Sequence, residues 1–196
     1  MFIEILIISA VSILILSFRH GLLDITKFHA EIKGYKILLI MAAIEAVAVS
    51  LFKRFSDIDL LNILSMTWLI YIPVLIVSLI NFDKHFMRLF FIGTLLNFIA
   101  ISCNDFKMPV FISNMAANSQ QTISYLSSGS DLIHSLANDT TNLKFLCDII
   151  TLPPPYPFVK TISIGDILLL SGVFIFWQET YSSKIEGYLI RGYQIK

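Results

Sequence analysis

The chain has 196 residues, of which 56% are hydrophobic and only 14% are charged, and its mean hydropathy is +0.78. Soluble domains carry about 25% charged residues, so this composition predicts a multi-pass membrane protein. The formal net charge is zero, which argues against a nucleic-acid partner because binding to phosphates needs a basic surface. The sequence shows no zinc-type spacing of Cys and His and no glycine-rich phosphate loop, so we expect no metal and no cofactor.

Five apolar segments follow one another along the chain, and we expect each to form a membrane-spanning helix. They cover residues 2–18, 36–52, 60–81, 86–103 and 161–178. The first lacks the basic start and the small-residue cleavage site of a signal peptide, so we interpret it as a retained anchor. At 1.5 Å per residue, its length is just sufficient for the hydrocarbon layer. The predicted fold is therefore all-α: a five-helix transmembrane bundle that forms a single integral-membrane domain over residues 1–196.

The distribution of lysine and arginine predicts the orientation, because cytoplasmic loops carry an excess of these residues. With the N-terminus outside and the C-terminus inside, the cytoplasmic side holds nine of them: Arg19, Lys27, Lys33, Lys36, Lys84, Arg88, Lys184, Arg191 and Lys196. The opposite side holds five, namely Lys53, Arg54, Lys107, Lys144 and Lys160. This N-out, C-in topology places the long polar segment between the fourth and fifth helices on the outer face.

That polar segment covers residues 104–160. Its first part, residues 112–130, is small and polar, whereas residues 131–146 alternate leucine and isoleucine with polar residues and predict a short interfacial helix. A loop of this length is uncommon in a compact fold unless it has a function, and two interpretations stay open, a solvated loop or a lid over a substrate. Cys103 and Cys147 flank most of it, either as a pair or as inert packing residues.

Two aspartates lie at the two ends of the proline-rich connection that leads into the last helix. Asp148 precedes Pro153-Pro154-Pro155, and Asp166 lies about one turn inside the last apolar segment. A carboxylate in an apolar membrane context is by default a candidate for a functional site. If the two carboxylates meet, one keeps a proton while the other stays charged, which suits general acid and base work on a water molecule.

Structural roles also explain the same residues, and the spacing alone favours them. Ser163 and Asp166 have the spacing of a capping box, in which the serine caps the helix and the acid reaches back to the serine amide. Asp148 would then be a solvated loop residue. A third interpretation is a small ion-coupled carrier that uses Glu45 and Asn97, two polar residues inside apolar segments.

The second half of the chain resembles an uncharacterised family of small bacterial integral-membrane proteins, domain of unknown function 5317. The resemblance is carried by Asn-Asp-Phe-Lys-Met-Pro-Val at residues 104–110, by Cys-Asp-Ile-Ile-Thr-Leu-Pro at 147–153 and by Ser-Ile-Gly-Asp at 163–166. Cys147 stands where that family usually has glycine. The resemblance implies a multi-pass protein of the bacterial cytoplasmic (inner) membrane.

A more distant resemblance links the order Asp-Ile-Ile, loop, Ser-Ile-Gly-Asp to the end of signal peptidase II, a membrane aspartyl peptidase. By position, the catalytic pair of that family corresponds to Asp148 and Asp166, which are 18 residues apart in this sequence. The Asn-Leu-x-Asp-Arg motif of that family is missing. The resemblance implies an aspartyl-peptidase-like activity on a membrane-anchored peptide or protein substrate within the lipid bilayer. The residues expected to bind or orient the substrate are Asn97, Asn104, Ser163 and Gly165.

Overall fold

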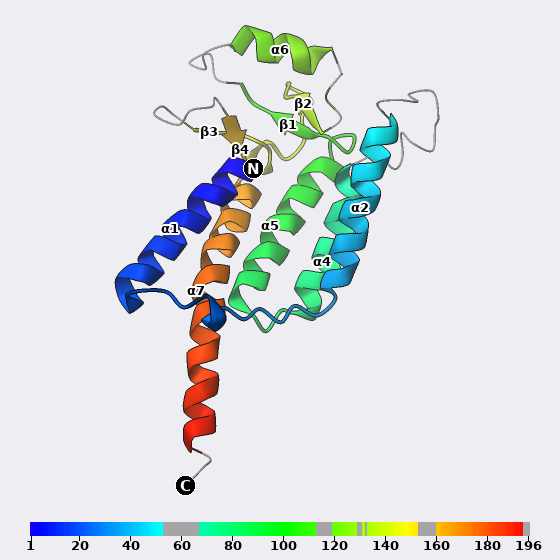
Figure 1. Ribbon diagram of the computed structural model, residues 1–196. Helices are drawn as coiled ribbons and strands as arrows, with labels where there is room; N and C mark the ends of the chain where they lie inside the picture. Colours follow the sequence, from blue (N-terminus) through cyan, green and yellow to red (C-terminus); the bar gives the residue numbers. More distant parts are fainter. Residues whose placement is uncertain (53–66, 113–118, 129–130, 132, 153–159, 194–196) are drawn as a thin grey trace.

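The computed structural model describes residues 1–52, 67–112, 119–128, 131, 133–152 and 160–193. Within these residues, five α-helices lie side by side and a smaller head region of strands and one short helix lies at one end of them (Figure 1). The side-by-side helices are α1 (Phe2–His20), α2 (Tyr35–Phe52), α4 (Tyr71–Ile80), α5 (His85–Ser102) and α7 (Ile164–Tyr193). The predominantly helical class expected from the composition is confirmed.

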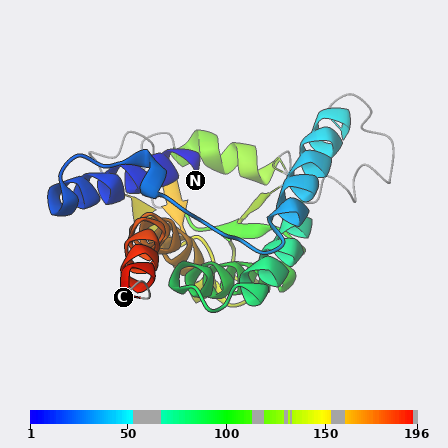
Figure 2. The same cartoon turned by 60° about the horizontal axis from the view of Figure 1, so that its bottom comes forward.

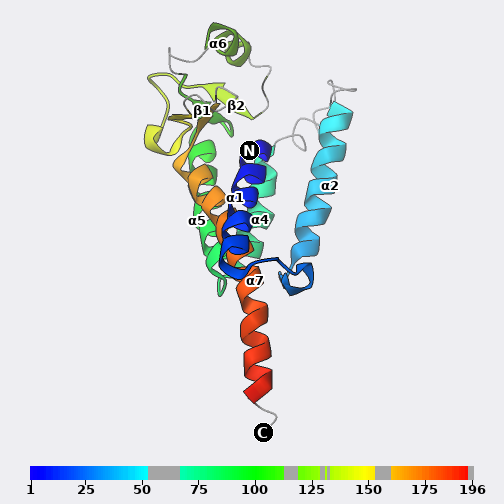
Figure 3. The same ribbon diagram turned by 60° about the vertical axis from the view of Figure 1, so that its left-hand side comes forward.

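The order of packing places α7 and α5 at the centre. The closest helix pair is α5 with α7; α1 packs on the other side of α7, and α4 connects α5 to α2. When the bundle is turned so that the end opposite the head comes forward, α1 and α2 lie at its two outer sides (Figure 2). The last part of α7 extends beyond the other helices, away from the head (Figure 3).

Among the residues that the structure describes, two helices are long and apolar enough to be candidate membrane spans: α1 and α5. Five spans are therefore not supported. The third predicted segment, residues 60–81, is the clearest departure, because α4 has only ten residues and follows the short 3-10 helix η2 (Thr67–Ile70). Ten residues rise about 15 Å, half of the hydrocarbon thickness. Residues 60–66 lie outside the described part of the chain.

The start of the last helix also differs from the prediction. Residues Lys160–Ile162 form strand β4, and α7 begins at Ile164 and continues to Tyr193, well past the expected end at residue 178. The apolar run from Ile162 onward hides this boundary in the sequence, since a β-branched pair such as Thr161 and Ile162 suits a strand as well as a helix. The strand pairs antiparallel with β3 (Ile150–Leu152), so that Ile162 lies opposite Ile150.

The head region consists of the described elements between α5 and α7. Strand β1 (Met108–Val110) pairs in parallel with β2 (His134–Leu136), and α6 (Ser119–Ser127) contacts β2. The predicted interfacial helix over residues 131–146 is wrong: this stretch contains β2 and the 3-10 helix η3 (Lys144–Leu146). Asp131 prevents helix propagation there, because its Oδ1 accepts hydrogen bonds from the backbone amides of Ile133 and His134 and so forms a turn.

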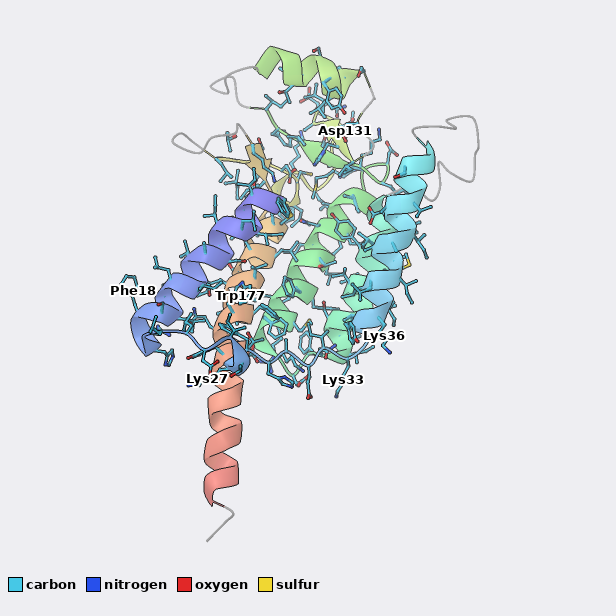
Figure 4. The ribbon with its side chains drawn as sticks, viewed as in Figure 1. Phe18, Lys27, Lys33, Lys36, Asp131 and Trp177 are labelled. Carbon is cyan, nitrogen blue, oxygen red and sulfur yellow. The ribbon has the colours of Figure 1, made fainter. Side chains whose placement is uncertain are left out.

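The outer helices present large apolar side chains to their surroundings. On α1, Phe2, Leu6, Leu14 and Phe18 are each more than half exposed, and Leu39, Ile40 and Val47 are on α2. Water would oppose such continuous apolar exposure, whereas lipid would not. Lys27 and Lys33 of the loop between α1 and α2, and Lys36 in the first turn of α2, lie along the end of the bundle opposite the head, whereas Asp131 lies in the head (Figure 4).

Candidate functional site

Asp148 is held by backbone pairing to the strand that carries the Met-Pro-Val motif. Its amide donates to the carbonyl oxygen of Pro109 at 3.0 Å, and its own carbonyl accepts from the amide of Phe111 at 2.9 Å. These bonds form an isolated parallel bridge between Val110 and Asp148. Asp148 is thus fixed in the head, with only 5% of its surface exposed. This burial differs from the solvated loop position that the structural interpretation assigned to it.

Two asparagines anchor the segment that precedes Asp148 to the end of α5. Asn104 Oδ1 accepts from the amide of Asn142 at 2.9 Å, and Asn104 Nδ2 donates to the carbonyls of Ala100 and Asn142 at 2.8 and 3.1 Å. Asn142 Nδ2 returns a bond to the Cys103 carbonyl at 2.9 Å. Asn104 therefore orients the backbone that leads to Asp148.

Next to the hydrogen bonds of Asn104 and Asn142, a small apolar core joins the helix bundle to the head. It is formed by Ala100 and Ile101 of α5, Met108 of β1 and Leu146 of η3. Cys147 is fully buried next to Asp148, whereas Cys103 is exposed, and both are free thiols. The pairing of these cysteines is absent from the structure.

Asp166 lies in the first turn of α7, where the structure shows one of the two hydrogen bonds expected of a capping box. Ser163 Oγ accepts from the amide of Asp166 at 2.9 Å, as a helix cap does. The carboxylate, however, accepts a hydrogen bond at Oδ1 from Asn97 Nδ2 of α5 at 2.8 Å. Ser163 Oγ in turn donates to Asn97 Oδ1 at 2.8 Å. Asn97 thus engages the helix-capping residue and the acid with its two amide atoms, all three side chains being buried.

Glycines allow α5 and α7 to approach closely enough for this bridge. A β-carbon at Gly93 would lie 2.7 Å from the carbonyl oxygen of Gly165, and a β-carbon at Gly165 would collide with the side chain of Asn97. Both positions therefore need glycine for packing, in the manner of small residues at membrane helix interfaces. Gly165, expected to orient the substrate, lies against Asn97 and makes room for it.

The β3–β4 pairing places both aspartates at the same end of the hairpin, where the charge of Asp166 acts on Asp148. Asp148 is two residues before Ile150, and Ile164, the first residue of α7, is two residues after Ile162, the partner of Ile150. The predicted proline-rich connection, with Pro153, Pro154 and Pro155, lies outside the described residues. Asp148 thus lies just before β3, and Asp166 lies just after β4, in the first turn of α7.

The electrostatics of Asp148 are those of an acid that holds a proton near neutrality. Burial, reinforced by the negative charge of Asp166, raises the pKa of the Asp148 carboxyl to about 7. Its Oδ1 is buried and has no hydrogen-bond partner among the residues that the structure describes. Asp166 is 8% exposed and is supplied with a donor by Asn97. The pair therefore combines one carboxyl that can stay neutral with one that is oriented as an acceptor.

Four further residues, in the surroundings of the acids, were not predicted as part of the site. Lys160 Nζ of β4 lies 3.0 Å from Glu4 Oε1 of α1, and its charge acts on Asp148 and Asp166. Tyr71 of α4 lies within electrostatic reach of both aspartates and packs on the apolar core. Gly93 precedes Asn97 by one helical turn, a spacing that could have indicated a shared face. Glu4 and Lys160 lie so far apart in the sequence that no local pattern connects them.

The predicted residues therefore separate into two groups. Asn97, Ser163, Gly165 and Asp166 contact one another where α5 meets the start of α7, and the charge of Asp166 acts on Asp148. Asn104 acts one step away, through the backbone that leads to Asp148. Glu45, the acid of the carrier interpretation, lies on α2, outside the hydrogen bonds of this group. The described residues hold no cluster of three or more His, Cys, Asp or Glu that could bind a metal ion.

Comparison with known proteins gives one family. The model of the Family of unknown function (DUF5317) matches residues 29–178, more than half of the chain. No curated protein and no solved structure matches this chain. The matched range includes both aspartates, Asn97 and the motifs around them, and α1 lies before its first residue.

Proposed function

Because the chain belongs to this family of unknown function, we propose a function from the site itself: an aspartyl-peptidase-like hydrolase that acts at the membrane. One observation carries the proposal. Asp148 precedes β3 and Asp166 follows β4 in the first turn of α7, and both carboxylates are buried. Burial and the charge of Asp166 raise the pKa of Asp148 to about 7, Asp148 Oδ1 has no hydrogen-bond partner among the described residues, and Asp166 accepts a hydrogen bond from Asn97. A structural salt bridge or cap does not require this difference between two acids, whereas acid–base catalysis does.

The reaction assigns a separate task to each carboxyl. Asp166, as the charged member, accepts a proton from a water molecule while the water oxygen bonds to the peptide carbonyl carbon. Asp148 gives its proton to the carbonyl oxygen, which produces a neutral tetrahedral diol. The proton on Asp166 then passes to the amide nitrogen, the carbon–nitrogen bond breaks, and one hydroxyl of the diol returns its proton to Asp148. The pair ends in its starting state, and one water has been consumed.

Asn97 and Ser163 position the base in this scheme. The hydrogen bond from Asn97 Nδ2 to Asp166 Oδ1 fixes the plane of the carboxylate, and the bond from Ser163 to Asn97 fixes the amide. A catalytic group must stay within about 0.5 Å of its productive position, so such support from a neighbouring helix is part of the mechanism.

The surroundings of the site favour a membrane setting and a membrane-linked substrate. The exposed apolar side chains of α1, α2 and α4 suit lipid, and the lysines of the loop after α1 lie at the end away from the head. In the proposed N-out, C-in arrangement, the bundle crosses the bacterial cytoplasmic membrane several times and the head faces outward. A membrane-anchored peptide or protein is the substrate class that fits a site at the junction of the head and the bundle.

A non-enzymatic role is the second candidate, and one observation favours it. The Ser163–Asn97–Asp166 network joins the start of α7 to α5 as a helix cap and a helix–helix contact. In that role the chain would be a non-enzymatic integral-membrane module whose aspartates are structural, and Asp166 would contribute to stability alone. The carrier interpretation, based on Glu45 and Asn97, stays a prediction.

Single substitutions in the purified protein, reconstituted in vesicles with membrane-anchored test peptides, distinguish hydrolysis from a structural role. We expect Asp148→Asn and Asp166→Asn each to reduce cleavage by at least about 100-fold, since each removes one proton-transfer group. Asp139→Asn, which changes an exposed aspartate of the head, is the matched control and should keep full activity. Cleavage that persists in both site variants with unchanged folding would eliminate the hydrolase, and loss of stability without any cleavage by the unmodified protein would favour the structural role.

A further inference from the structure

Two loops of the head are joined to each other at the end of α5. Asn104, which follows α5, bonds to the amide and the carbonyl of Asn142, and Asn142 Nδ2 donates to the carbonyl of the residue before Asn104. The chain after Asn142 forms η3, whose Leu146 packs on α5 in the apolar core. In Figure 3 the yellow part of the chain, which follows β2, comes down beside the head-side end of α5. Residues 103–107 and 142–145, the clamped loops, therefore lie at the level where α5 ends.

The backbone of the clamped loops adopts an unfavourable conformation. Among the described residues, the non-glycine residues with positive φ are Asp105, Phe106 and Leu143, with φ of 54°, 56° and 46°. All three lie in the clamped loops. Residues with a side chain avoid this left-handed region because the β-carbon crowds the backbone, and a bulky leucine is an outlier there. Such a conformation persists only where surrounding contacts fix it, as the bonds of Asn104 and Asn142 do here.

The same loops expose apolar side chains. Phe145 is 59% exposed, Phe106 is 43% exposed and Leu143 is 38% exposed. In water, exposed apolar area is unfavourable, and at Phe106 and Leu143 this adds to the cost of the left-handed backbone. A loop that only faced water would gain nothing from fixing three apolar side chains in this way.

The position of the clamped loops indicates what they contact. α5 is one of the two candidate membrane spans. In the membrane setting proposed above, its last residue, Ser102, marks the level at which the chain leaves the hydrocarbon layer. The clamped loops follow at once, so they lie at the interface between hydrocarbon and headgroups. Apolar side chains at this depth are stabilised by acyl chains. The exposed Asp105 and Lys144 of the same loops can meet the headgroups, whose phosphates attract the lysine.

We propose that the clamped loops insert Phe106, Leu143 and Phe145 into the lipid leaflet on the head side and so hold the head against the membrane surface. The partner is the lipid surface itself, because these loops continue directly from the end of a candidate membrane span. The inference rests on the membrane setting of the proposed function but does not require hydrolysis. Anchoring η3 also fixes the height of Asp148, which is the second residue after it.

Single-tryptophan variants of the full-length protein in phosphatidylcholine vesicles test the inference. In a background with Trp68→Phe and Trp177→Phe, the substitutions Phe145→Trp and Leu143→Trp are made separately, and quenching by brominated phospholipids is compared with quenching by aqueous iodide. Tyr125→Trp is the matched control, because Tyr125 is 53% exposed and lies on α6, on the side of the head away from the helices (Figure 1). We expect brominated lipid to remove about half of the emission or more at positions 145 and 143 and little at 125, and iodide to do the reverse.

A nitroxide label gives a second measurement that keeps both native tryptophans, for use if their replacement prevents folding. The exposed Cys103 is replaced by serine, and the buried Cys147 is inaccessible to the labelling reagent. The label is then attached in Phe145→Cys, with Tyr125→Cys as the control. Collision with oxygen, which concentrates in lipid, should dominate at position 145, and collision with a water-soluble nickel complex should dominate at position 125.

The outcomes separate the inference from the function. Lipid contact at position 145 together with water contact at position 125 supports the inference whether or not the protein cleaves peptides. Water contact at both positions overturns it, even if the protein is a hydrolase. Shielding of position 145 from lipid and water alike also overturns it, because that result describes a contact with a second copy or another protein. Lipid contact at both positions overturns it too, since the whole head would then be immersed in lipid.

Discussion

Replacing Asn97 by leucine removes both hydrogen bonds of the bridge between α5 and α7 while keeping a side chain that branches at the same carbon. The bond to the Asp166 carboxylate is charge-assisted and contributes about 1.5–3 kcal/mol, and the bond from Ser163 contributes about 0.5–1.5 kcal/mol. All three groups are buried, so water does not replace the lost partners. We therefore expect Asn97→Leu to lower the free energy of unfolding by about 2–4 kcal/mol.

Equilibrium unfolding in mixed micelles measures this loss, and Ile92→Ala provides the comparison. Ile92 lies on the same helix, is 42% exposed and takes no part in the bridge, so its truncation should cost less than about 1 kcal/mol. In the Asp166→Asn background the Asn97→Leu cost should fall by about 1 kcal/mol or more, because the bond is no longer charge-assisted. A cost below 0.5 kcal/mol, or full additivity in the double variant, would refute the energetic role assigned to the bridge.

The remaining predictions concern pH, helix packing and the membrane. Burial raises the pKa of the Asp148 carboxyl from its ordinary value of 3.8 to about 7 in the folded state. Between these values only the folded state binds the proton, so the free energy of unfolding should fall by about 1.4 kcal/mol for each unit by which the pH rises from 4 to 7. Asp148→Asn should remove this slope in denaturant titrations, and an unchanged slope would contradict the assignment. Cleavage should likewise decline above pH 7 in rate measurements, as Asp148 loses its proton, and a rate that kept rising would argue against Asp148 as the acid. Gly165→Ala places a methyl group on the Asn97 side chain and should cost about 1–3 kcal/mol in thermal unfolding, whereas Ser171→Ala, at an exposed position of the same helix, should cost less than about 0.5 kcal/mol. Leu14 lies at the middle of α1 and its side chain is 55% exposed. Leu14→Lys should make the apparent free energy of membrane insertion of α1 less favourable by about 2.5–3.5 kcal/mol in a glycosylation-mapping assay. Leu22→Lys, in the loop, should leave this free energy unchanged.

Local patterns were sufficient for the helices whose apolar runs are long and uninterrupted. α1 was expected to end at residue 18 and ends at His20, where Gly21 adopts a φ of 74°, a conformation that glycine provides at low cost. The prediction for residues 131–146 was wrong because scattered leucines resemble a helical face, whereas the turn at Asp131 and the pairing of β2 with β1 decide the structure. Strands of three residues carry too little periodicity to be predicted from sequence.

The candidate site was predicted in its acids and missed in its surroundings. Asp148 and Asp166 stand out because carboxylates are rare in apolar segments, and Ser163 stands out through its spacing from Asp166. The bond from Asn97 to Asp166 joins residues 69 apart in sequence, and the ion pair of Glu4 with Lys160 joins the first helix to the last hairpin. These contacts depend on how the helices pack, which hydropathy and spacing do not determine.

The bridge at Asn97 has a consequence for how the chain reaches its final form during synthesis. When α1 through α5 have left the ribosome, Asn97 has no Ser163 or Asp166 to bond with, and Glu4 has no Lys160. The pair of acids exists only after the hairpin has folded back and α7 has docked against Gly93. A nascent or truncated chain therefore lacks the site, which is complete only once α7 has packed against α5.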